Sequence, residues 1–288
     1  MKALVHSSGG SKGSWGAGVI KHLLGDLQIH YSILAGTSVG AINASFISQF
    51  PIGEEKHASK ALEELWLKLN NSKIFTRWSP FGRLHAAWKM SFYDSSPLHK
   101  IIRENIILNK VRSSGKLITV GAVSLSSGKY TIFTQDDDDF IDAILASSAF
   151  PGMLTPIKMR GQLWLDGGVK CLSPIDAAIN QGATEIDVIT TSPEIRVKKF
   201  IENPSIIDIF KRTVDLSTDK ILSNDIEKVL MYNKLAEAGV SNKKVIKLRI
   251  LRPHNNLIED VLDFRPEKIR EMMAKGYQDA INNYKSYE

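Results

Sequence analysis

The chain contains almost no cysteine and no long apolar run. Its 288 residues include a single cysteine, Cys171, so an intrachain disulfide is excluded and a reducing compartment is expected. No apolar stretch approaches the roughly 20 residues that an α-helix needs to span a bilayer. The first residues also lack the apolar core of a secretory signal peptide, because a glycine-rich segment follows almost at once. We therefore expect a cytoplasmic protein without a Sec signal peptide or transmembrane segment, which meets membranes only peripherally.

Signatures of nucleotide and metal binding are also missing. A phosphate-binding loop needs a lysine after its last glycine, whereas Lys12 precedes Gly13. A dinucleotide-binding fingerprint fails because Ser8 stands where its first glycine should be. The acidic run at residues 136–139 lacks the interleaved spacing of an EF-hand loop, which favours a solvated turn before a helix. The sequence therefore predicts neither a cofactor nor a metal.

No internal repeat or low-complexity linker divides the chain, and its hydrophobic content of 43% with 24% charged residues is typical of a globular protein. We predict a single domain over residues 1–288. The 37 basic and 31 acidic residues give a net charge of +6, which would attract the protein to anionic membranes or to nucleic acid. Because no nucleic-acid-binding module is recognised, we expect no nucleic-acid partner.

The residues around Ser38 form a Gly-x-Ser-x-Gly motif. An apolar run at residues 33–35 precedes Gly36-Thr37-Ser38-Val39-Gly40, and small apolar residues follow. This pattern is typical of a serine on a sharp strand-to-helix turn, where glycines permit the tight backbone and the helix dipole points at the serine. Short Gly/Ser segments also occur as plain loops. Ser38 is the candidate nucleophile.

A glycine-rich loop, Ser7-Ser8-Gly9-Gly10-Ser11-Lys12-Gly13, follows a predicted strand at residues 2–6 and precedes a predicted helix at residues 14–25. Turns of this kind expose consecutive backbone N–H groups, which can hold an anion. In a serine hydrolase that anion is the oxyanion of the tetrahedral intermediate. The structural alternative is an ordinary tight turn between a strand and a helix.

A carboxylate ends another predicted strand. Residues 162–166 alternate as a strand, and Asp166 is followed by Gly167-Gly168. An aspartate at the carboxyl end of a strand lies where an open α/β sheet places its chemistry. Asp-Gly-Gly is also a good plain turn. Asp166 is therefore a candidate catalytic residue only in combination with Ser38.

Taken together, these elements resemble the patatin-like phospholipase family. The matching segments are Gly9-Gly10-Ser11-Lys12-Gly13, Gly36-Thr37-Ser38-Val39-Gly40, Ala146-Ser147-Ser148-Ala149-Phe150-Pro151-Gly152 and Asp166-Gly167-Gly168. Their order and spacing match over most of residues 1–192, and residues 245–253 and 264–284 look like the family's closing strand and helix. The family usually begins its first loop with a third glycine, and Ser8 occupies that position here.

The resemblance implies a three-layer α/β/α fold with a central, mostly parallel sheet and a nucleophile elbow. The catalytic motifs would lie within residues 1–192. Residues 54–110 would form a helical insertion that shapes the acyl pocket, and residues 200–288 would supply the closing strand and helices.

The resemblance also implies a lipid acyl hydrolase, of the phospholipase A or lysophospholipase type, with a serine–aspartate dyad. Ser38 Oγ would attack the ester carbonyl while Asp166 accepts its proton, and Asp166 would then activate the water that releases the fatty acid. Because an ordinary aspartate has a pKa near ~3.9, positioning and the oxyanion hole must lower much of the barrier. The amides of Gly9, Gly10 and Ser11 would form that hole. The supporting motif residues would be Lys12, Gly13, Gly36, Gly40, Gly167 and Gly168.

Two alternatives stay open. An α/β-hydrolase triad in the order Ser, Asp, His would use His254, the only histidine after Asp166, with Asp166 or Asp187 as its partner. Against this, Ser38 leaves room for only two strands before the elbow. The second alternative is a non-catalytic lipid- or protein-binding module with the same fold.

One stretch suggests contact with a membrane or micelle surface. Residues 73–93 contain no acidic residue. Their aromatic and basic members are Phe75, Trp78, Phe81, Trp88, Phe92, Tyr93, Lys73, Arg77, Arg83 and Lys89. Aromatic rings beside basic groups suit the headgroup level of a bilayer, although such aromatics also pack into cores or cover active-site clefts.

Overall fold

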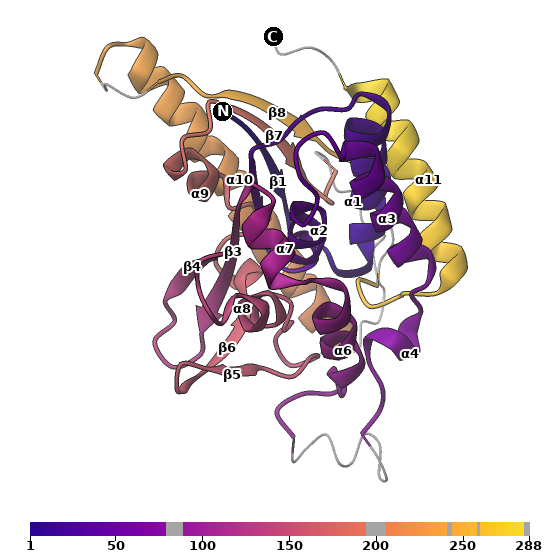
Figure 1. Ribbon diagram of the computed structural model, residues 1–288. Helices are drawn as coiled ribbons and strands as arrows, with labels where there is room; N and C mark the ends of the chain where they lie inside the picture. Colours follow the sequence, from indigo (N-terminus) through magenta and orange to yellow (C-terminus); the bar gives the residue numbers. More distant parts are fainter. Residues whose placement is uncertain (79–88, 194–205, 241–243, 258–259, 285–288) are drawn as a thin grey trace.

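A mostly parallel sheet of eight strands runs through the centre of the protein, with helices on both of its faces (Figure 1). The computed structural model describes residues 1–78, 89–193, 206–240, 244–257 and 260–284. The strand order is β5-β6-β3-β2-β1-β7-β8, and β4 pairs with β3. The strands are β1 (Lys2–His6), β2 (Ile33–Gly36), β3 (Leu117–Ser124), β4 (Tyr130–Thr134), β5 (Ile157–Met159), β6 (Gln162–Asp166), β7 (Glu185–Ile189) and β8 (Lys247–Leu251). The predicted α/β/α fold class is confirmed.

Most of the helices lie in the connections between these strands, and α11 follows the last strand. They are α1 (Gly13–Ile20), α2 (Val39–Ser48), α3 (Glu55–Leu67), α4 (Asn71–Ile74), α6 (Ser96–Asn105), α7 (Leu108–Ser113), α8 (Phe140–Ser147), α9 (Ile175–Asn180), α10 (Ile206–Glu237) and α11 (Pro266–Asn283). Four of them, α3, α4, α6 and α7, lie between α2 and β3, in the stretch where a helical insertion is predicted. Within the ranges that the structure describes, no helix combines the length and apolar character needed to cross a bilayer.

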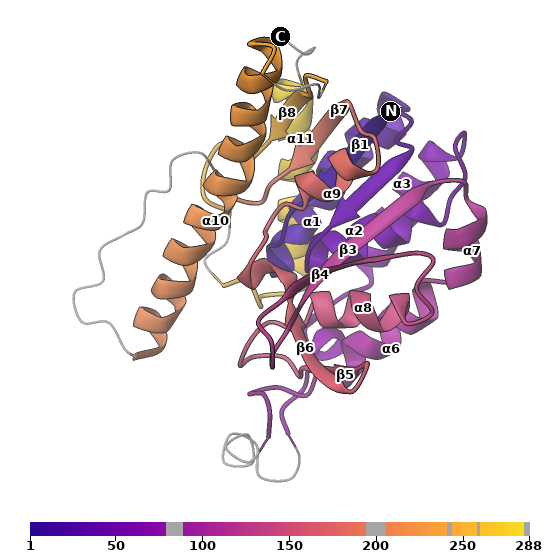
Figure 2. The same ribbon diagram turned by 90° about the vertical axis from the view of Figure 1, so that its left-hand side faces the viewer.

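Two apolar cores lie on opposite faces of the sheet, because successive side chains of a strand point to opposite faces. On β1, Leu4 belongs to the larger core, to which α1, α2, α3, α6, α8 and α11 contribute. Its neighbours Ala3 and Val5 point to the other face and pack with residues of α9 and α10. Figure 2 shows α10 on the opposite side of the molecule from α3 and α7. The central strands β1, β2, β3 and β7 are therefore buried on both faces, as expected for a parallel sheet covered by helices.

The pairing of β3 brings two distant segments together. Thr119 and Val120 pair with both β2 and β4, so these two strands lie on opposite edges of β3. Ala122 pairs with both β4 and β6, so β6 also lies opposite β4. β2 and β6 therefore occupy the same edge of β3, one after the other. The carboxyl ends of β2 and β6 meet there, which places Asp166 beside the turn that leaves β2.

Candidate functional site

Ser38 sits on the sharp turn between β2 and α2, in a backbone conformation that side chains rarely adopt. Its φ is 57° and its ψ is −127°. Such a conformation costs about 1–3 kcal/mol and persists only when the surroundings enforce it. A Cβ on Gly36 would lie 2.3 Å from the Gly40 carbonyl oxygen, and a Cβ on Gly40 would lie 2.1 Å from the His6 carbonyl oxygen. The two glycines of the motif are therefore required by close packing around the turn.

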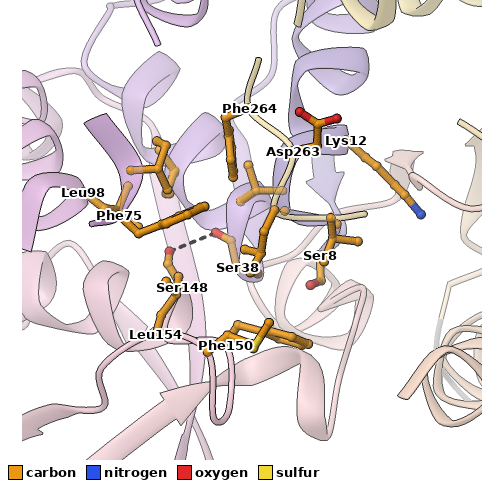
Figure 3. A pocket seen from close by; sticks show the side chains of 18 of the residues that line it. Ser8, Lys12, Ser38, Phe75, Leu98, Ser148, Phe150, Leu154, Asp263 and Phe264 are labelled. Carbon is orange, nitrogen blue, oxygen red and sulfur yellow. Dashed lines mark hydrogen bonds between the residues drawn. The ribbon is translucent and has the colours of Figure 1, made fainter. Parts of the chain in front are cut away.

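Two serines at the end of α8 also form hydrogen bonds with the backbone of Ser38. The Ser38 N–H donates to Ser147 Oγ at 2.9 Å, and Ser148 Oγ donates to the Ser38 carbonyl at 3.4 Å (dashed line in Figure 3). These contacts give the Ala-Ser-Ser-Ala segment a role in the geometry of the turn: its two serines bond the amide and the carbonyl of the strained residue.

Asp166, at the end of β6, is buried, and the Ser38 side chain lies close enough to its carboxylate to act on its pKa. Its Oδ1 also accepts the Gly168 N–H at 2.7 Å. Burial raises the pKa of Asp166 to about 7, although the Ser38 side chain and the bond from Gly168 favour the charged form and oppose the rise. A carboxylate with this pKa is a much better proton acceptor near neutral pH than an ordinary aspartate.

The glycine-rich loop passes beside Ser38 and is shaped by contacts from the far end of the chain. Gly10 has a φ of 57°, and a Cβ there would lie 2.3 Å from the Val261 carbonyl oxygen. The Ser11 N–H donates to the same Val261 carbonyl at 2.8 Å. Among the described residues, the amides of Gly9 and Gly10 bond to no acceptor. The Ser11 amide is thus occupied, which leaves Gly9 and Gly10 of the three amides predicted to form an oxyanion hole.

The remaining motif residues are positioned by close approach. A Cβ on Gly13 would lie 2.2 Å from Val39 Cγ2, so Gly13 lets α1 approach α2. A Cβ on Gly167 would lie 2.2 Å from the Gly121 carbonyl oxygen of β3. Lys12 ends the short turn after Gly10 and lines the cavity described next.

A cavity of about 1080 Å³ opens beside Ser38. This volume is at the upper end of the range for small-molecule sites. Its apolar wall comes mainly from the helices between residues 54 and 110, with Leu65, Leu69, Ile74, Phe75, Leu98, Ile101 and Ile102. Its polar wall includes Ser8, Gly9, Gly10, Lys12, Thr191, Asp263 and Arg265. Figure 3 shows Phe75 and Leu98 on one side of Ser38 and Ser8 and Lys12 on the other. Ser38 therefore lies at the boundary between an apolar and a polar compartment.

A buried network of hydrogen bonds, which no sequence motif indicated, lies next to the glycine-rich loop. Asn43 on α2 donates through Nδ2 to His6 Nε2 at 3.2 Å and to the Gly13 carbonyl at 3.0 Å. Its Oδ1 accepts the Trp66 Nε1–H at 2.9 Å. His6 Nδ1–H donates to the Ser7 carbonyl at 2.9 Å, and burial lowers the pKa of His6 to about 4, so the ring is neutral. The network ties the glycine-rich loop to α2 and α3.

His254 and Asp187 are not brought to this site. His254 is exposed in the segment after β8 and is not among the described residues that line the cavity. Asp187 lies buried in β7, where it accepts the Tyr31 hydroxyl at 2.5 Å and pairs with Arg249 at 3.3 Å. The histidine needed for a Ser-Asp-His arrangement is therefore not in place.

The acidic run pairs with arginines. Arg160 bonds Asp137 at 2.6 Å and Asp139 at 2.7 Å, and Arg112 lies 3.3 Å from Asp138. In the part of the chain that the structure describes, no group of three or more His, Cys, Asp or Glu side chains is arranged to hold a metal ion.

The aromatic and basic stretch divides into half-buried and exposed members. Phe75 and Tyr93 pack against each other with ring centroids 4.5 Å apart, and both line the cavity. Phe92 also lines it but is 61% exposed, and Met90 is 57% exposed. The predicted members Phe81, Arg83 and Trp88 lie outside the described residues.

Comparisons with known proteins place these features in a family. Residues 4–179 match the family model described as patatin-like phospholipase. The uncharacterized protein YjjU of Escherichia coli K12 is 26% identical over 192 residues, which are 66% of this chain and 52% of that protein. The probable lipid hydrolase 463L of invertebrate iridescent virus 6 is 28% identical over 162 residues, 51% of this chain and 55% of that protein.

Two further similarities extend over more of the chain. Mouse calcium-independent phospholipase A2-gamma is 25% identical over 271 residues, 78% of this chain and 34% of that protein. The solved structure of VipD from Legionella pneumophila aligns with a TM-score of 0.47 at 13% identity, over 98% of this chain and 66% of that one. The chain thus spans about half or less of the curated relatives that it matches. Because the family model matches more than half of the 288 residues, the protein belongs to the patatin-like phospholipase family.

Proposed function

We propose that the protein cleaves fatty-acyl esters of lipids, as a phospholipase A or lysophospholipase, with Ser38 as nucleophile and Asp166 as general base. The observation that carries the proposal is that Asp166 lies beside Ser38, which lines the cavity, and that Ser38 favours the charged form of its carboxylate. The strained turn at Ser38 and the raised pKa of Asp166 support it, because such perturbations cluster at functional sites. The names of the viral probable lipid hydrolase and the mouse calcium-independent phospholipase A2-gamma agree with this substrate class.

In the first step Ser38 Oγ attacks the ester carbonyl, and the hydroxyl proton of Ser38 passes to Asp166. The free amides of Gly9 and Gly10 are the donors that we assign to the oxyanion of the tetrahedral intermediate. Breakdown of the intermediate returns the proton to the leaving alcohol and leaves an acyl ester on Ser38. In the second step water attacks this ester while Asp166 accepts its proton, and the fatty acid departs. The apolar wall between residues 54 and 110 would hold the acyl chain.

The substrate would enter from a membrane or micelle surface. Phe92 and Met90 are exposed beside the cavity, and Lys89 lies 5.2 Å from the ring of Trp78. Arg77, which lines the cavity, adds a positive charge to the same segment. Apolar side chains among basic groups suit insertion at the headgroup level of an anionic bilayer.

The test is acyl release from phospholipid vesicles by the wild-type protein and by the variants Ser38→Ala and Asp166→Asn. Both variants should lose at least about 100-fold in rate, because each removes a group that acts in the reaction. Mass spectrometry should also find a fluorophosphonate adduct on Ser38 in the wild type. Equal rates in all three proteins, with no adduct, would instead favour a lipid-binding module without activity. A large loss in His254→Gln would restore the triad alternative.

A further inference from the structure

Ser8 lines the cavity next to the two proposed catalytic residues, and its backbone is fully engaged. Its N–H donates to the Leu172 carbonyl at 3.2 Å, and its own carbonyl accepts Thr191 Oγ1 at 2.8 Å and Ser7 Oγ at 3.3 Å. No hydrogen bond joins Ser8 Oγ to any other residue in the described ranges of the chain. The loop thus fixes the position of Ser8 and leaves its hydroxyl available to a molecule in the cavity.

The hydroxyl of Ser8 and the carboxylate of Asp166 both lie against Gly168. A carbon at the Cβ position of Gly168 would lie 3.0 Å from Asp166 Oδ1 and 3.1 Å from Ser8 Oγ. A side chain at residue 168 would crowd both oxygens, so the glycine allows them to lie close to each other. Asp166 is only 2% exposed and is not among the described residues that line the cavity, whereas Ser8 is. Ser8 therefore connects the cavity with the side of Asp166 that faces Gly168.

We propose that Ser8 Oγ and Asp166 Oδ1 together hold the water that hydrolyses the acyl ester on Ser38. This inference rests on the proposed function. Acylation removes the Ser38 hydroxyl proton, so Ser38 can no longer donate to Asp166 and the carboxylate needs a new donor. One hydrogen of the water points to Asp166 and the other to Ser8, which directs an oxygen lone pair towards the acyl carbon.

The step balances without any further reactant. The water oxygen bonds to the acyl carbon as one of its protons moves to Asp166. The tetrahedral intermediate then collapses, the bond from the acyl carbon to Ser38 Oγ breaks, and the proton on Asp166 passes to Ser38 Oγ. The products are the fatty acid and the regenerated dyad.

The test separates the two chemical steps in Ser8→Ala and Ser8→Gly. Rapid-quench experiments with a p-nitrophenyl ester give the acylation rate from the p-nitrophenol burst, and mass spectrometry follows the decay of acyl-Ser38. Both variants should slow deacylation about tenfold, the effect of one positioning hydrogen bond, and leave acylation within about twofold of wild type. Ser8→Gly keeps the test valid if the alanine variant folds poorly, since glycine fits a loop of this kind.

The matched control is Ser7→Ala, which removes a neighbouring hydroxyl that bonds the same loop through the Ser8 carbonyl and the Thr191 N–H. It should not make acyl-Ser38 accumulate. If acyl-Ser38 forms but the Ser8 variants slow acylation and deacylation equally, the inference is overturned. It is also overturned if their deacylation rate is unchanged. Absence of acyl-Ser38 in the wild type would instead overturn the proposed function, and the inference with it.

Discussion

Gly36 and Asp166 lie next to each other along one edge of β3, opposite Val120 and Ala122. β2 ends at Gly36 and turns into the elbow, while β6 approaches along the same edge from the opposite direction and ends at Asp166. The carboxylate therefore reaches Ser38 on the end of a strand, and the rigid sheet fixes the distance between the two side chains. Sites built on such elements are held more precisely than sites on loops.

The raised pKa of Asp166 predicts how activity depends on pH. Only the carboxylate form accepts the Ser38 proton, so kcat/KM should rise with pH through an apparent pKa near the value of about 7 that burial gives this group. An unperturbed aspartate would place this limb near ~4. The measurement is a pH profile with an uncharged ester substrate, with circular dichroism recorded at each pH as a control for unfolding. A limb centred near ~4 would contradict the assignment of Asp166 as a desolvated base.

The same group predicts a pH-dependent stability difference for Asp166→Asn. The pKa of Asp166 is higher in the folded protein, about 7, than the ordinary 3.8, so between these values the folded state binds more protons than the unfolded state. The contribution of Asp166 to wild-type stability therefore falls as pH rises through this window and is constant above it. The variant should match the wild type below pH ~4, gain Tm relative to it up to pH ~7 and keep that gain at higher pH.

Thermal unfolding across this pH range measures the effect, and Asp136→Asn is the control because Asp136 is exposed. The control should show no such trend. If the Tm gain of Asp166→Asn over the wild type shrinks as pH rises, the pKa of Asp166 is not raised by folding.

The sequence pointed to Ser38 and Asp166 as candidates because both follow apolar strand patterns and adjoin glycines, which are local signals. It could not predict which amides of the glycine-rich loop are already bonded, since the Val261 carbonyl that occupies the Ser11 amide comes from the other end of the chain. The network around Asn43 also depends on side chains that meet only after folding. His6 and Trp66 lie on different elements, and neither belongs to a recognisable motif. Their contacts follow from tertiary packing, which local patterns do not encode.

Asn43 is predicted to stabilise both the fold and the active geometry. Asn43→Ala would leave the Trp66 N–H and His6 Nε2 buried without partners, which should cost at least about 2 kcal/mol in the free energy of unfolding. Because Asn43 also bonds the Gly13 carbonyl at the end of the glycine-rich loop, kcat should fall more than KM rises. Urea denaturation and steady-state kinetics test this, with Asn105→Ala on α6 as a half-buried control. Wild-type stability in Asn43→Ala would show that the network contributes little.

Narrowing the apolar part of the cavity should change which acyl-chain lengths the protein prefers. Leu98 on α6 is buried and lines the cavity beyond Phe75 from Ser38 (Figure 3), so Leu98→Trp should exclude long chains and spare short ones. The ratio of kcat/KM for a palmitoyl ester to that for a butyryl ester should fall at least about tenfold, since filling an apolar pocket discriminates by one to a few kcal/mol. Leu67→Trp, on α3 at a position 44% exposed, is the matched control and should leave the ratio unchanged. Equal losses on both esters would mean general damage to the fold, and an unchanged ratio in Leu98→Trp would mean that the acyl chain binds elsewhere.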